Sequence, residues 1–196
     1  NQTSRQGCVN IHDAIDSKRI MSFVVISLLP ALFFGMYNVG YQNYAAAGTL
    51  ADSTFWDLFI FGFLAVLPKI LVSYIVGLGI EFVVAQWKNE EIQEGFLVSG
   101  ILIPMIIPVN TPLWTLALAV AFSVIIAKEI FGGTGMNIFN PALITRAFLF
   151  FSYPSVMTGD DNVWVAQESI FGFGNNLPDT FTAATPLGEA AVGNAV

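Results

Sequence analysis

The chain has 196 residues, of which 55% are hydrophobic and only 11% are charged. An ordinary soluble domain carries roughly 25% charged residues, so this composition predicts a membrane protein. The formal net charge is −7, and the seven Lys and Arg residues are scattered along the chain. That distribution excludes nucleic-acid binding, which needs clustered cations.

The scarcity of cysteine and histidine limits the cofactors that the chain can hold. Cys8 is the only cysteine and His12 the only histidine. An internal disulfide and a Cys/His cluster for zinc or iron–sulfur binding are therefore excluded. His12 lies in a polar N-terminal segment and receives no role. We predict no metal site, and we expect any redox cofactor to be organic.

The first two apolar stretches have the roughly 17–25 residues that a helix needs to cross a bilayer. Residues 20–37 follow a basic pair, Lys18 and Arg19. Residues 58–80 form a second stretch that carries Lys69 near its middle. Both are predicted to be transmembrane helices.

Three shorter apolar stretches follow. The uncharged run 95–127 has 33 residues, too many for one span, and prolines interrupt it in the sequence "PVNTP". We therefore predict two helices, 95–107 and 113–127, on either side of this break. The last stretch, 141–157, opens with a proline at the first helical position.

The predicted fold class is all-α: a polytopic transmembrane helix bundle with about five spans. With five crossings the cations near the span ends all fall on one side, which the positive-inside rule makes cytoplasmic: Lys18, Arg19, Lys88 and Lys128. The prediction divides the chain into a cytoplasmic N-terminal segment (1–19), the bundle (20–157) and an external loop (158–196).

Charged residues within the spans are expected to face the bundle, water or a helix end, because each would cost a few kcal/mol unpaired in lipid. Lys69 could serve as a counter-ion or gate in an ion or quinone path, or it could snorkel or pair within a larger complex. Arg146 could meet an anionic cofactor or a neighbouring acid. Glu81 falls under the same expectation.

A glycine-rich loop, "KEIFGGTGMNIFNPALITRAF", separates the last two predicted helices. Its glycines permit close backbone approach, and Asn137 and Asn140 add amide groups before a helix N-terminus. This combination suits an anion or a polar ring system, and a purely structural glycine loop is the alternative. The loop is neither a Walker loop nor a Rossmann turn, because it lacks the G-K-[ST] ending and a preceding strand.

The segment "NEEIQEGFLVSG" places three acids at the predicted cytoplasmic mouth of the third span: Glu90, Glu91 and Glu94. Acidic residues at a pore mouth attract cations, whereas an ordinary charged loop is simply solvated. For Glu94 the pattern alone leaves both possibilities open, a place on an ion path or a solvated loop.

The stretch "DTFTAATPL" near the end of the chain resembles the flavinylation signal D-x-x-[S/T]-x-A-[T/S]. In that signal a flavin transferase attaches FMN through its phosphate to the final hydroxyl residue. The matching positions are Asp179, Thr182, Ala184 and Thr185. Ala183 stands where such motifs often have glycine, a small-for-small difference.

Further motifs accompany this signal elsewhere in the chain. "DAIDSKRIM", "GMYNVGYQ", "QEGFLVSGIL", "PLW", "KEIFGGTGMNIFNPALITRAFLFFSYP" and "TAATPL" occur in order. In this the chain resembles the family that contains the B subunit of sodium-translocating NADH:quinone oxidoreductases and the D subunit of Rnf electron-transport complexes. The resemblance covers nearly all of 13–187, and "DSKRIM" and "MYNVGYQ" favour the quinone-reductase branch. Family subunits are longer, so the chain looks like an N-terminal portion.

The resemblance implies a translocase subunit in a bacterial inner membrane, with the flavin loop on the external face. It would relay electrons through covalent FMN on Thr185 toward riboflavin and quinone, coupled to Na+ export. The implied partners are other membrane subunits, including a second FMN carrier, together with quinone, a flavin transferase and lipid. No NADH site and no catalytic side chain of its own are expected.

Two alternatives remain at this point. The chain could be the D subunit of an Rnf-type ferredoxin:NAD complex. It could also be a cofactor-free ion transporter or structural membrane subunit, since proline-broken helices and buried charges occur in transporters.

Overall fold

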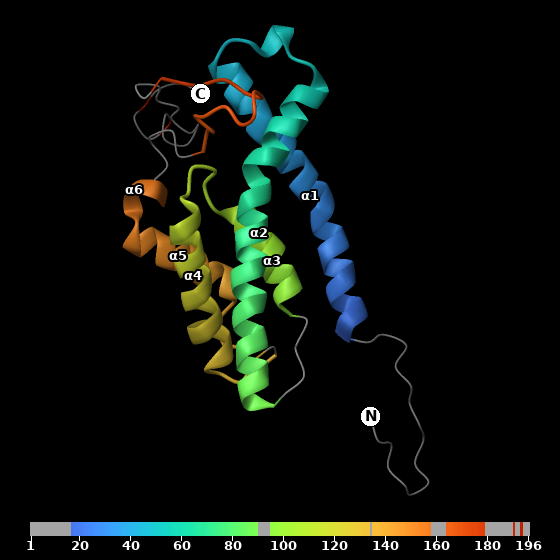
Figure 1. The fold of residues 1–196 in the computed structure, drawn as a ribbon, viewed down its shortest axis with the longest axis vertical. Helices are drawn as coiled ribbons and strands as arrows, with labels where there is room; N and C mark the ends of the chain where they lie inside the picture. The colour runs from blue at the N-terminus through green and yellow to red at the C-terminus, as the bar shows by residue number, and fades with distance from the viewer. Residues whose placement is uncertain are drawn as a thin grey trace, which may run out of the picture.

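The computed structural model describes residues 17–89, 95–133, 135–157 and 164–178, with residues 190 and 193. In this part of the chain the regular structure is helical (Figure 1). The elements in order are α1 (Ser17–Ala46), a 3-10 turn (Leu50–Asp52), α2 (Phe55–Lys88), α3 (Phe96–Ile106), α4 (Leu113–Ser123), a π-helix (Val124–Glu129), α5 (Pro141–Ser152) and α6 (Pro154–Met157). The predicted all-α membrane bundle is confirmed.

The two long helices, α1 and α2, form an antiparallel pair that spans the height of the molecule (Figure 1). They are the two described helices long and apolar enough to cross a membrane, with 30 and 34 residues. The start of α2 is fixed by a capping box, in which the Thr54 N–H donates to Asp57 Oδ2 over 3.0 Å. Its end is fixed by Asn89 in the left-handed conformation, with φ of 54°.

Glycines let α1 and α2 approach closely. A Cβ at Gly40 would overlap the Leu58 carbonyl, and a Cβ at Gly62 would overlap the Met36 carbonyl. Lipid tails are as apolar as the side chains, so the hydrophobic effect adds little to the association of helices in a membrane. Close backbone packing of this kind is then a main source of helix association. Small residues at these two positions therefore set the spacing of the pair.

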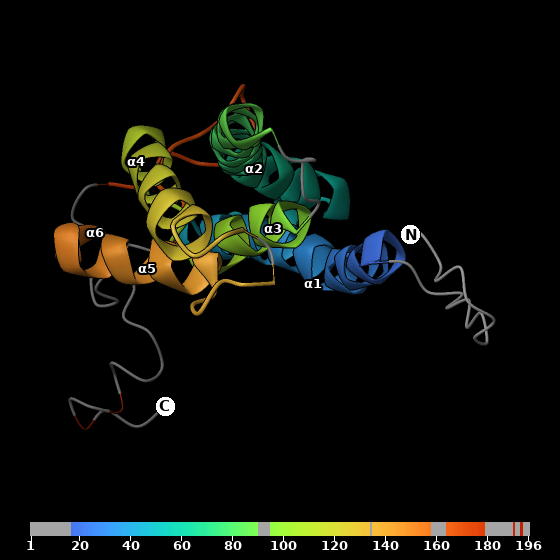
Figure 2. The ribbon, with the colours of Figure 1, turned by 90° about the horizontal axis from the view of Figure 1, so that it is seen from below.

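The third and fifth predicted stretches are only partly matched, since α3 covers 96–106 and the stretch 141–157 is divided between α5 and α6. The run 95–127 does break at its prolines, with α3 ending at Ile106 and α4 beginning at Leu113. Proline ends a helix because it lacks an N–H donor and restricts the residue before it. The π-helix, which the sequence did not reveal, continues α4 directly. α3 packs on α1, α2 and α5 in the interior of the bundle (Figure 2).

The main core lies where α2, α3, α4 and α5 meet. Its fully buried side chains include Phe96, Ile103, Leu116, Val120 and Leu149. A second, smaller cluster joins α1 to α2 through Leu32, Met36 and Val66. The helices thus form one packed bundle, with α1 attached at its edge.

Segment 164–178 has little regular structure and lies at the end of the bundle where α1 joins α2 (Figure 1). This end is opposite to the start of α1 at Ser17. The predicted flavin motif begins at Asp179, directly after this segment. The fold therefore places the described approach to the motif next to the α1–α2 connection.

Candidate functional site

Asn43 anchors segment 164–178 to the end of α1. Its side chain is fully buried. Its Nδ2 donates to the carbonyls of Ala166 and Asn175, at 2.8 and 3.0 Å, and its Oδ1 accepts from the Asn175 N–H at 2.8 Å. One amide side chain thus holds both arms of the segment, the first arm at Ala166 and the second at Asn175. Buried polar groups are usually hydrogen-bonded in this way.

Further hydrogen bonds fasten the second arm. The Gly174 N–H donates to the Tyr44 hydroxyl at 3.0 Å, and the Asn175 side chain donates to the Thr49 hydroxyl at 2.8 Å. Gly174 has φ of +78°, and a Cβ there would overlap the Phe61 ring. Only glycine fits this turn without strain.

The first arm is tied to the proline break between α3 and α4. Asn110 donates from its side chain to the Val165 carbonyl at 2.8 Å. The Leu177 N–H closes the segment by donating to the Gln167 carbonyl at 2.9 Å. Helix break and segment therefore form one polar layer at this end of the bundle.

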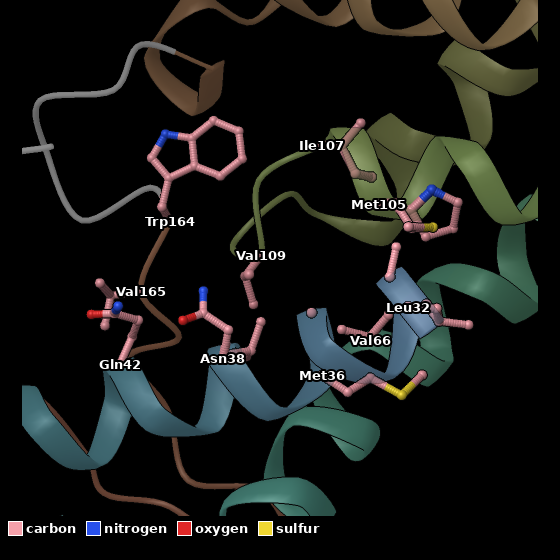
Figure 3. A pocket seen from close by; sticks show the side chains of 14 residues that line it. Leu32, Met36, Asn38, Gln42, Val66, Met105, Ile107, Val109, Trp164 and Val165 are labelled. Atoms are coloured by element: carbon pink, nitrogen blue, oxygen red, sulfur yellow. The ribbon is translucent and has the colours of Figure 1, made fainter. Parts of the chain in front are cut away.

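An apolar cavity of about 380 Å³ lies on one side of this layer (Figure 3). Its floor is aliphatic and sulfur-containing, and Asn38 and Gln42 of α1 face Trp164 at its rim. Its other lining residues are Ala31, Leu32, Gly35, Met36, Val39, Val66, Pro104, Met105, Ile107, Val109 and Val165. With no charged side chain among these residues, the cavity is suited to an apolar molecule.

A polar cavity of about 370 Å³ lies between α2, the helix break and segment 164–178. Lys69 lines it and is 8% exposed, with its ammonium donating to the Ala65 carbonyl at 3.1 Å. The rest of the lining comes from the helix break (Val109, Asn110, Thr111) and from segment 164–178 (Ala166, Gln167, Glu168, Ile170). A buried cation thus lines a space whose other polar lining residues are Asn110, Thr111, Gln167 and Glu168.

A buried ion pair joins α2 to the π-helix near the other end of the bundle. Lys128 and Glu81 are each 4% or less exposed and are hydrogen-bonded to one another. Lys88 and Glu129 form a second, more exposed pair at 3.2 Å. The sequence predicts Lys128 as a cation at a span end, and its side chain is instead packed inside the bundle. Glu81 faces the bundle, as its position in a span requires.

The glycine loop gives its asparagines local structural roles. Asn140 caps α5 by accepting from the Ala142 N–H at 2.9 Å. Asn137 accepts from the Gly135 N–H at 3.2 Å and donates to the Phe139 carbonyl at 2.9 Å. Arg146 is exposed on α5. Asn137 and Lys128 both line a cavity of about 50 Å³. A flavin vicinity for Asn137, Asn140 and Arg146 stays a prediction.

The flavinylation positions Asp179, Thr182, Ala184 and Thr185 lie outside the described residues, and so does Glu94. Their roles stay predictions. The anchors of the segment, by contrast, were missed in the sequence. Asn43 is a polar residue near a helix end, which is common in any membrane protein, and its partners are more than 120 positions away.

The comparison with protein families matches residues 6–195 to the sequence model of the NQR2, RnfD, RnfE family. The match covers almost the whole chain. The chain belongs to this family. The membership agrees with the ordered motifs in the sequence and with the helical bundle.

Curated relatives narrow the resemblance within the family. The chain is 41% identical over 205 residues to the B subunit of the Na(+)-translocating NADH-quinone reductase of Ectopseudomonas mendocina. It is 39% identical to the protein of the same name from Azotobacter vinelandii. In both alignments 94% of this chain and 48% of the relative are covered. The chain thus spans about half the length of these relatives.

Proposed function

We propose that the chain is the N-terminal portion of a membrane subunit of a sodium-translocating NADH:quinone reductase, and that it carries FMN on Thr185. The observation that supports this proposal best is the coincidence of two matches. The family covers 6–195, and within that range "DTFTAAT" fits the flavinylation signal. The relatives named above belong to the sodium-translocating branch rather than to the Rnf branch.

The residue chemistry of the loop agrees with this role. A threonine hydroxyl can form a phosphoester with FMN, and a permanent tether replaces affinity that a half-exposed site would have to supply by contacts. The bound FMN would supply the redox chemistry. The small side chains of Ala183 and Ala184 would give a flavin transferase access to the hydroxyl of Thr185. Pro186 disfavours a helix at Thr185.

The wider proposal follows the family. The chain would receive electrons from an FMN-carrying sister subunit and pass them toward riboflavin and quinone, coupled to Na+ export across a bacterial inner membrane. NADH oxidation would belong to another subunit. The N-terminus is proposed to be cytoplasmic and the flavin loop external, as the distribution of Lys and Arg indicates.

Glu94 is proposed to attract sodium at the cytoplasmic mouth of the third apolar stretch. Glu94→Gln keeps the shape of the side chain and removes its charge. We expect a higher sodium concentration to be needed for half-maximal quinone reduction in this variant, at unchanged assembly. An unaltered sodium dependence would remove Glu94 from the ion path.

A cofactor-free ion transporter is the alternative of a different class. The proline break between α3 and α4 and the buried charges Lys69, Glu81 and Lys128 agree with it. Intact-mass measurement separates the two proposals. Protein produced with a flavin transferase should gain the mass of one FMN, whereas a transporter without cofactor would keep the mass of the bare chain.

A further inference from the structure

We propose that the polar cavity at Lys69 receives the pyrimidine edge of the FMN carried on Thr185, and that Lys69 sets the redox potential of that flavin. This inference rests on the proposed function, because it requires the covalent FMN. It goes further by naming the place in the bundle where the ring is held.

The lining of the cavity fits such a ring. At about 370 Å³ the cavity lies at the lower end of the roughly 300–1,000 Å³ found for small-molecule sites. The ammonium of Lys69 has three N–H donors, and within the described residues only the Ala65 carbonyl accepts from it. Gln167 adds an amide that can both donate and accept. The pyrimidine edge of a flavin alternates two carbonyl acceptors with one N–H donor, which matches this set.

The charge of Lys69 points to the reduced form of the ring. Reduction of a flavin leaves negative charge at its N1 and C2 carbonyl unless a proton follows. A cation close to that edge stabilises this charge, and the interaction is stronger in a buried site than in water. The apolar cavity has no such cation among its lining residues.

The chain also leads from the cavity to the attachment site. Gln167 and Glu168 line the cavity, and the Leu177 N–H is bonded to the Gln167 carbonyl at 2.9 Å. The described segment ends one residue later, at Pro178. Thr185 lies seven positions beyond Pro178, and seven residues can span at most about 25 Å. Thr185 can therefore lie no farther than about 25 Å from Pro178, whose neighbour Leu177 is bonded to the cavity-lining Gln167.

Glu168 provides a control substitution that should shift the flavin potential in the direction opposite to the Lys69 substitution. It is exposed and lies at the rim of the same cavity, so its carboxylate opposes the charge of Lys69 on any group bound between them. If the ring occupies the cavity, removing the cation and removing the anion must shift its potential in opposite directions. A purely structural role of Lys69 gives no such pair of effects.

The test is a spectroelectrochemical titration of the covalent FMN in the intact complex, comparing Lys69→Met, Lys69→Arg and Glu168→Gln with the unaltered protein. We expect a lower midpoint potential in Lys69→Met, a nearly unchanged one in Lys69→Arg and a higher one in Glu168→Gln. An unchanged potential in both Lys69→Met and Glu168→Gln would overturn the inference. If Lys69→Met fails to assemble, Glu168→Gln decides alone, because its side chain is exposed.

The experiment also separates this inference from the proposed function. Covalent FMN that is present but insensitive to both substitutions would refute the cavity assignment and leave the proposed function standing. Absence of covalent FMN from the unaltered complex would refute both. A shift that affects only a non-covalent flavin, and that survives in Thr185→Ala, would overturn the assignment of the cavity to FMN.

Discussion

At the scale of single residues, Asn43 is the clearest example of a side chain whose role depends on tertiary structure. It satisfies three backbone groups of segment 164–178 from a fully buried position. A buried polar group that loses its partner costs about 1–3 kcal/mol. Asn43 therefore contributes to holding segment 164–178 in place, together with Tyr44, Thr49 and Asn110.

We predict that Asn43→Ala loosens segment 164–178 while the helices stay folded. The alanine leaves the Asn175 N–H and two carbonyls without their partner, and the helix core does not involve them. Hydrogen exchange measured by mass spectrometry should show faster exchange in the peptides that cover this segment. Ser27→Ala is the control, since Ser27 is an exposed polar residue of the same helix whose hydroxyl donates to the Val24 carbonyl within that helix. Equal protection of the segment in both variants would contradict the anchoring role.

At the scale of elements, the buried pair of Glu81 and Lys128 links α2 to the π-helix. Both side chains are removed from solvent, and within the described residues Glu81 Oε2 has no hydrogen-bond partner. Removing one member of such a pair leaves an uncompensated buried charge, which typically costs about 3–5 kcal/mol, whereas replacing both with apolar residues is often neutral.

The effects of substitutions in this pair are predicted to be strongly non-additive. Lys128→Met and Glu81→Leu should each lower the thermal stability of the purified protein in detergent, and the double variant should recover most of the loss. Differential scanning fluorimetry of the four proteins measures this. If the double variant lost the sum of the two single effects, the pair would not be a coupled unit.

The elements also show how far the sequence could predict the fold. The hydropathy of α1 and α2 and the prolines at residues 108 and 112 were sufficient to predict the two long helices and the break between α3 and α4. These signals are local. The helix ends were predicted less well, because α1 continues to Ala46 through residues polar enough to end an apolar stretch.

The candidate site could be predicted only in part, because it depends on contacts between distant residues. Lys69 was identified as an intramembrane cation, but the cavity around it needs the helix break and segment 164–178 to meet α2. The partner of Lys128 lies 47 positions away and leaves no trace in the local pattern. For Thr185 the situation is reversed: the sequence motif predicts its role, and the residue lies outside the part of the chain that the structure describes.

At the scale of the whole molecule, the helix bundle holds a polar layer at one end, and the chain continues from this layer toward the proposed flavin-attachment loop. The helical bundle and the family membership agree with one another. The chain covers about half of its relatives, and α1 is largely exposed here. Among the described α-helices, α1 packs only on α2 and α3, and its apolar surface is largely exposed.

The central claim is that Thr185 carries FMN, and its most direct test is mass spectrometry of the subunit produced with a flavin transferase. The intact mass should rise by one FMN, and peptide mapping should place the addition on Thr185. Thr185→Ala should abolish it, because the phosphoester oxygen is gone. Thr182→Ala keeps the attachment oxygen and is the matched control. An addition that persists in Thr185→Ala, or an intact mass equal to that of the bare chain, would contradict the claim.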